Sequence, residues 1–99
     1  MKYCSYRKGI IVEVKNSSKD DYKYITIAED VNNIYTFTKL VYSKQTIILN
    51  HDYNEIPVED LKVGDTVFVY HSNVMTLSIP PQTVAYIIEV KWLKIINNK

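Results

Sequence analysis

The segment Asp60–Val90, DLKVGDTVFVYHSNVMTLSIPPQTVAYIIEV, is the most informative part of this 99-residue chain. In order, it contains a tight turn at 62–65, a buried strand at 66–70, a polar loop at 71–82 and most of a long closing strand, which is expected to cover 83–94. Gly64 occupies a turn position that favours positive φ, and Val67 and Val69 share one face of their strand. This order of elements is typical of small closed β-barrels.

Upstream of this segment, short runs of β-branched and aromatic residues predict four more strands. They cover residues 9–15, 24–29, 34–39 and 45–50. In the first strand, the period-2 alternation places Ile10, Val12 and Val14 on one face and Ile11 on the other. In the second strand, Ile25 and Ile27 share a face. In the closing strand, one face is expected to carry Val84, Tyr86, Ile88, Val90 and Trp92.

About six short strands and one helical turn at Val58–Leu61 predict a single all-β domain over residues 1–99. A long first strand, a hairpin and a helical turn before the last two strands favour a five- or six-stranded OB-like barrel. Such barrels bend their first strand at a glycine or bulge. Gly9 is expected to lie at the start of that strand, where it is a poor substitute for a bend.

Composition fits a folded protein that functions without disulfides. Hydrophobic residues make up 46% of the chain, and Cys4 is its one cysteine, as expected in a reducing compartment. The sequence contains no apolar run that would serve as a leader or membrane span, so we expect a cytoplasmic protein. Frequent Ile, Lys, Asn and Tyr indicate a low-GC bacterial genome, of the kind found in Firmicutes.

Charge is nearly balanced, with 12 basic and 11 acidic residues and a net charge of +1. Nucleic-acid-binding proteins usually carry a basic surplus, because contacts with phosphates supply much of their affinity. Single-stranded nucleic acid therefore stays an alternative ligand rather than the favoured one. The residues expected to bind it, by stacking and by phosphate contact, are Tyr24, Tyr35, Lys23 and Lys39.

The run Asp60–Ala85, DLKVGDTVFVYHSNVMTLSIPPQTVA, resembles the C-terminal part of an uncharacterised group of OB-like modules from low-GC Gram-positive bacteria. Members of that group often carry the pattern DLKxGDxVYVYHSxxMTxSxPPQxxA and often occur beside copper-amine-oxidase-like stalk domains. The resemblance covers about residues 60–90. It implies a barrel fold and an extended motif, and it implies no activity.

The 71–82 segment has two interpretations. In the first, it is a binding loop, and the expected contact residues are Tyr70, His71, Met75 and Gln82. In the second, it folds over one end of the barrel, with Met75 and Ile79 filling the core and its hydroxyl groups bonding the backbone.

No spacing of residues supports a catalytic or metal site. Cys4, His51, His71 and Met75 would suit a soft metal ion, but they match no closed ligand motif. Ser72 directly follows His71, and adjacent strand residues point to opposite faces. We therefore expect a non-enzymatic binding module without a cofactor. Its partner would be an unknown protein or peptide, and the chain would be a monomer or a homodimer paired through a strand edge.

Overall fold

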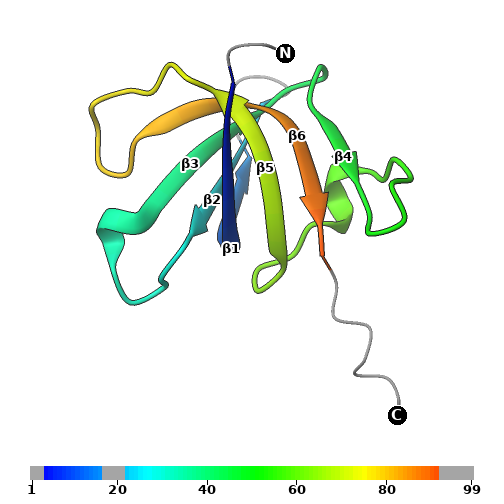
Figure 1. Ribbon diagram of the computed structural model, residues 1–99, viewed down its shortest axis with the longest axis horizontal. Coiled ribbons are helices and arrows are strands. Elements are labelled where there is room, and N and C mark those ends of the chain that lie inside the picture. The colour runs from blue at the N-terminus through cyan, green and yellow to red at the C-terminus, as the bar shows by residue number, and fades with distance from the viewer. Residues whose placement is uncertain (1–3, 17–21, 92–99) are drawn as a thin grey trace.

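The computed structural model describes residues 4–16 and 22–91, which form six strands and two short 3₁₀ helices (Figure 1). The strands are β1 (Cys4–Asn16), β2 (Lys23–Ala28), β3 (Phe37–Tyr42), β4 (Ile47–Leu49), β5 (Thr66–Ser72) and β6 (Gln82–Val90). The 3₁₀ helices are η1 (Ile34–Thr36) and η2 (Val58–Asp60). No helix in these two ranges has the length and apolar character needed to cross a membrane.

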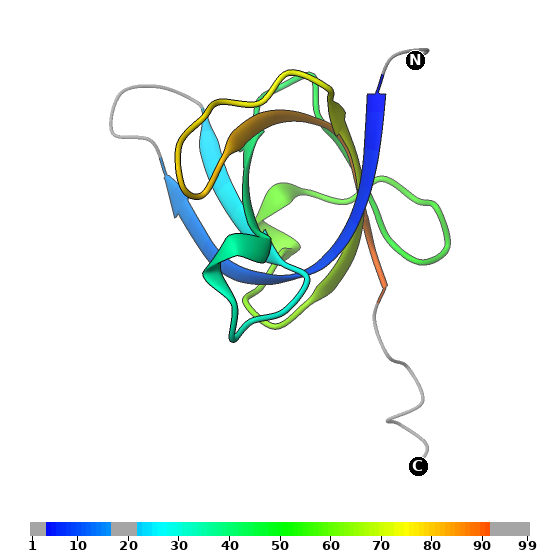
Figure 2. The ribbon, with the colours of Figure 1, turned by 60° about the vertical axis from the view of Figure 1, so that its left-hand side comes forward.

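Five of the strands close into a barrel, as Figure 2 shows from one end. The strand order is β3-β2-β1-β5-β6, and a parallel pairing of β3 with β6 closes the ring. All other pairings within the ring are antiparallel. The sixth strand, β4, lies outside the ring and pairs in parallel with β6. The predicted small all-β, OB-like barrel is confirmed.

Strand β1 pairs with one strand over its first half and with another over its second half, and Gly9 lies near the point where the partner changes. Residues 4–10 pair with β5, and residues 10–16 pair with β2. A Cβ atom at Gly9 would lie 3.0 Å from the carbonyl oxygen of Ala28. The prediction that Gly9 begins the strand was wrong, because the strand starts at Cys4. Gly9 thus lies inside the strand, where the missing side chain lets the end of β2 approach closely.

The predicted apolar face of β1 was also wrong. Ile11 is fully buried, whereas Ile10 is 37% exposed. The register with β2 shifts between Ile11 and Glu13, which marks a β-bulge at Val12. An extra residue in one strand reverses the alternation beyond it, so Val14 packs against the core on the same side as Ile11.

A second register shift changes the faces of β6. Tyr70 pairs with Ile87 and His71 pairs with Ala85, which leaves Tyr86 as the extra residue. Ala85 is therefore buried, and Val84 is 44% exposed instead of sharing a face with buried Ile88 and Val90. Trp92, which was assigned to the same face, lies outside the described residues.

Strand β3 begins later than predicted and continues further. Residues 34–36 form η1, and Asn33 is its N-cap. The Asn33 side chain accepts a hydrogen bond from the Tyr35 N–H at 3.0 Å. This side-chain cap favours a helical turn over a strand. The connection expected from Leu40 onward is instead the second half of β3. The antiparallel pairing of this strand with β2 is as predicted.

The segment before β5 agrees with its prediction. Gly64 has φ +100°, and the Asp65 carboxylate accepts a hydrogen bond from the Lys62 N–H at 3.0 Å. Val58 of η2 and Leu61 are both buried against the barrel core. The core is completed by residues from every strand: Ile11, Ile25, Ile27, Leu40, Ile48, Val67, Val69, Ala85, Ile88 and Val90.

Candidate partner-binding site

The β5–β6 loop, residues 73–81, is held in shape by its own hydroxyl groups. The Thr76 N–H donates to the Gln82 carbonyl at 3.0 Å, and the Gln82 N–H donates to the Thr76 hydroxyl at 2.9 Å. Ser78 lies 2.6 Å from the Thr76 hydroxyl and donates to the Pro80 carbonyl at 3.0 Å. These bonds join the two sides of the loop, so its conformation is set before any partner arrives.

The base of the loop is tied to the barrel through Thr83. Its hydroxyl lies 2.9 Å from the Ser72 carbonyl and 2.8 Å from the Val74 carbonyl, and the side chain is buried. The Ser72 hydroxyl in turn accepts the Val74 N–H at 3.0 Å. The second interpretation of this segment was therefore right about the hydroxyl groups, because they satisfy backbone groups.

That interpretation was wrong about the apolar side chains of the loop. Ile79 is 65% exposed, Val74 is 79% exposed and Leu77 is fully exposed at 101%. Met75 is half-buried rather than part of the core. The loop therefore presents apolar side chains to solvent while its Thr76 and Ser78 hydroxyl groups bond within the segment, the reverse of what an isolated surface loop would be expected to do.

A shallow groove of about 250 Å³ lies between the loop and the barrel wall. Its lining comes from β3, the loop and the start of β6: Val41, Ser72, Val74, Met75, Thr76, Gln82, Thr83 and Val84. We call this the loop groove. It is largely apolar in character, and it continues into the exposed side chains of the loop. Two of the predicted contact residues, Met75 and Gln82, line it together.

The other two predicted contact residues lie elsewhere. Tyr70 is on the outer surface of β5, where its ring centroid is 5.0 Å from that of Tyr6. His71 is fully buried inside the end of the barrel, because adjacent residues of β5 point to opposite sides of the sheet. A partner that docks on the outside does not reach this imidazole, so we leave His71 out of the site.

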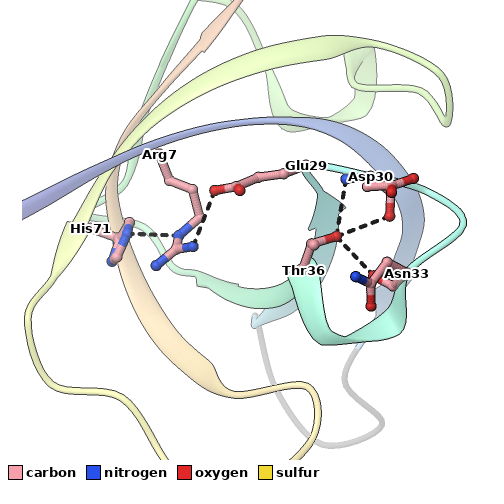
Figure 3. A network of polar contacts seen from close by, with 6 residues as sticks. All are labelled: Arg7, Glu29, Asp30, Asn33, Thr36 and His71. Carbon is pink, nitrogen blue, oxygen red and sulfur yellow. Dashed lines mark hydrogen bonds and ion pairs between the residues drawn. The ribbon is translucent and has the colours of Figure 1, made fainter.

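His71 instead belongs to a chain of polar contacts across the barrel end, which Figure 3 shows. Its Nδ1 donates to the Ser72 carbonyl at 2.9 Å, and its Nε2 accepts from Arg7 Nε at 3.4 Å. Arg7 Nη1 then reaches Glu29 Oε2 at 3.5 Å. Burial lowers the pKa of His71, and the Arg7 charge acts in the same direction, against the raising effect of the Ser72 carbonyl. The lowered pKa favours the neutral form of the imidazole at pH 7.

The structure brings together only some of the residues predicted for nucleic-acid binding. Tyr24 and Lys39 do meet, with the ammonium 5.6 Å from the ring centroid. Lys23 bonds to the Asn16 side chain. Tyr35 is 78% exposed in η1, which follows the end of β2, whereas Tyr24 lies near the start of that strand.

A different aromatic cluster was missed. On the outer face of β1 and β5, Tyr6 packs edge-on to Phe68 with centroids 5.9 Å apart and also contacts Tyr70. The ammonium groups of Lys8 and Lys91 lie 5.8 Å and 5.3 Å from the Phe68 centroid. We call these five residues the aromatic–lysine face. Alternation of Tyr6, Lys8 and Ile10 was the signal, and it was overlooked because the strand was expected to begin at Gly9.

In residues 4–16 and 22–91, no group of three or more His, Cys, Asp or Glu side chains is arranged to hold an ion. His51 lies near Asp52 on the β4–η2 connection, with 3.4 Å between Nε2 and Oδ1, while His71 faces Arg7 in the barrel end. The described part of the chain thus defines a class of protein, a small closed barrel with an apolar loop groove.

Comparison of this chain with protein families, characterised proteins and solved structures found no match.

Proposed function

We propose that this chain is a non-enzymatic interaction module that docks a protein partner on its β5–β6 loop. The observation that carries the proposal is the full exposure of Leu77 on a loop whose Thr76 and Ser78 hydroxyl groups are already bonded. Burying such a leucine at an interface would contribute roughly 1.5–3 kcal/mol. Because the loop is preorganised, little of that gain would be spent on ordering it.

The loop groove extends the possible contact area beyond the exposed side chains of Val74, Leu77 and Ile79. Val41 and Val84 form its floor, and Met75 adapts to partners of different shape because its side chain is unbranched. Exposed apolar patches of this kind, with polar residues around them, mark interaction sites more often than random surface does. Gln82 supplies a polar edge that fixes orientation.

Photo-crosslinking tests this proposal in cells of the source organism. A photoreactive side chain at position 77 is compared with one at Val63, which is 65% exposed in the turn before β5. We expect a discrete adduct from position 77 alone. Excess unlabelled wild-type protein should compete it away, and excess Leu77→Ser protein should not. Equal adducts from both positions, or equal competition by both proteins, would exclude the loop as a docking site.

The second candidate function is binding of single-stranded nucleic acid, and the aromatic–lysine face is the observation that favours it. Tyr6 is 51% exposed and Tyr70 is 40% exposed, so both rings offer surface for base stacking. Lys8 stands beside them, whereas Lys91 already bonds to Glu89 at 2.9 Å. Fluorescence anisotropy with labelled single strands at about 50 and about 200 mM salt tests this candidate, because phosphate-driven affinity falls steeply over that range.

A further inference from the structure

The N-terminal half of β1 is paired on one edge only. From Ser5 to Gly9 its partner is β5, and pairing with β2 starts at Ile10. Among residues 4–16 and 22–91, no strand lies against the other edge of this stretch. We call it the open edge of β1. Unpaired edges of this kind accept additional strands.

The backbone groups that face the open edge follow from the register. The Ile11 N–H donates to Asp65 at 2.9 Å and the Ile11 carbonyl accepts from Gly64 at 2.8 Å, so the backbone of Ile11 faces the β5 side. In an antiparallel pair this direction alternates along the strand. Arg7 and Gly9 therefore also face β5, whereas the N–H and carbonyl groups of Tyr6 and Lys8 face the open edge.

A cleft of about 490 Å³ lies beside this part of β1. Residues 6–10 of β1 form one side, and the others that line it are Ala28, Glu29 and Thr66. Ala28 is the last residue of β2 and pairs with Ile10. A strand laid antiparallel to β1 beyond Ala28 would therefore continue the line of β2, next to the residues that line this cleft.

The charge of the cleft selects the occupant. Arg7 is partly exposed and makes two long contacts, 3.4 Å to His71 and 3.5 Å to Glu29, which use two of its five N–H donors. Figure 3 shows its guanidinium between these two partners, within the barrel end. Lys8 adds a second positive charge, against the single carboxylate of Glu29. An incoming carboxylate would meet a guanidinium with donors to spare.

We propose that the open edge of β1 binds an extended acidic peptide as an added strand, antiparallel to β1, with an Asp or Glu side chain on Arg7. This site goes beyond the proposed function of the β5–β6 loop and uses a different surface. A second copy of this chain is a poorer occupant. Self-pairing about a two-fold axis at Arg7 would place the Arg7 side chains opposite each other, and like charges opposite one another destabilise a strand pair.

Selection from a display library of random ten-residue peptides tests the proposal, using the 99-residue protein as bait. Enriched peptides should alternate β-branched residues, contain Asp or Glu and lack proline. Lys8→Pro removes an N–H that faces the open edge and no bond to β5, so this variant should lose binding. Lys8→Ala keeps the N–H and removes only one positive charge, so it should retain most of the binding that Lys8→Pro loses. Arg7→Gln should weaken binding about tenfold or more, as expected for loss of a charge-assisted bond.

Three further measurements test the same proposal without the Lys8→Pro variant, in case that variant does not fold. N-methylation of alternate residues in an enriched peptide should abolish binding only at the residues that face β1. The amides of Tyr6 and Lys8 should become protected from hydrogen exchange when the peptide binds. Leu77→Ser should leave this binding unchanged, which separates the site from the loop groove.

Four results would overturn the proposal. The first is failure to enrich acidic peptides. The second is equal affinity for wild-type and a folded Lys8→Pro protein. The third is protection that appears in residues 73–81 instead of at Tyr6 and Lys8, which would support the loop as the docking site and exclude the edge. A concentration-dependent dimer, seen by sedimentation and abolished by Lys8→Pro, would assign the edge to self-association and likewise exclude the peptide.

Discussion

The Cα of Gly9 lies so close to Ala28 that a Cβ there would be 3.0 Å from the Ala28 carbonyl oxygen and 3.2 Å from Ile27 Cβ. Both neighbours are parts of a buried strand, so neither has room to move. The point at which β1 passes from one partner to the other thus depends on one residue that lacks a side chain. This relationship leads to the first prediction.

Gly9→Ala should destabilise the barrel by about 1–3 kcal/mol, the usual cost of forcing an extra carbon into a packed site. The effect should appear as a lower urea midpoint with an unchanged slope. Lys8→Ala, on the neighbouring exposed residue, is the matched control and should lie within about 0.5 kcal/mol of wild type. Equal stability of Gly9→Ala and wild type would show that β2 can shift away from β1.

Leu77→Ser should leave folding stability within about 0.5 kcal/mol of wild type, because the side chain is fully exposed. Leu40→Ala, at a fully buried core position, should cost about 2–5 kcal/mol. Urea denaturation of both variants measures the difference. A large loss from Leu77→Ser would mean that the loop folds back onto the barrel in solution, which contradicts its role as a docking surface.

Thr83→Val should destabilise the protein by about 1–3 kcal/mol, because it removes the hydroxyl that bonds the Ser72 and Val74 carbonyls. It should also loosen the loop, seen as faster hydrogen exchange at the Thr76 amide. Thr46→Val is the matched control, since its buried hydroxyl donates to the Ala85 carbonyl at 2.8 Å, away from the loop. This control should lose stability and keep the Thr76 amide protected.

His71 should make the barrel less stable in mild acid. An unfolded histidine has a pKa of about 6.5, and burial lowers the pKa of His71 in the folded state. As the pH falls below the pKa of the unfolded histidine, the unfolded chain binds a proton that the folded protein does not yet bind. The free energy of unfolding therefore decreases. At pH above the unfolded pKa, the contribution is fully present.

Replacing His71 with Gln removes this titration and keeps an acceptor for Arg7. The free energy of unfolding, measured from about pH 7.5 to about pH 5, should fall more steeply for wild type than for His71→Gln. Arg7 and Glu29 are present in both proteins, so their contribution cancels in the comparison. Parallel pH profiles would show that the imidazole takes up its proton equally in both states.

Sequence patterns predicted an element correctly where only one structural reason explains the residue at each position. Gly64 is needed at its turn because φ is positive there, and Val67 and Val69 alternate with neighbours that are not fully buried, so the prediction that they share a face was correct. In β1, apolar residues occupy consecutive positions from Ile10 to Val12, so alternation does not tell which face is buried. The bulge at Val12, a property of pairing with β2, then places Val14 on the same side as buried Ile11.

The residues predicted for the candidate site likewise fall into two groups, those that line the loop groove and those that lie elsewhere. Met75 and Gln82 were predicted as contacts and lie together in the loop groove. His71 was assigned to the same surface because it is polar, yet its partners come from distant parts of the chain, Arg7 of β1 and through it Glu29. Burial of a polar side chain becomes favourable only when such partners are present, and local sequence does not reveal them. Whether Tyr70, Met75 and Gln82 bind a partner stays a prediction.

The barrel is closed by its shortest pairing, three residues of β3 against three of β6, at Lys39–Val41 and Gln82–Val84. The loop groove lies over this closure, with Val41 on one side and Val84 on the other. A partner seated there would contact both strands of the pairing that closes the barrel. Occupancy and closure are then thermodynamically linked, so the docked partner would slow hydrogen exchange in strands that it does not touch.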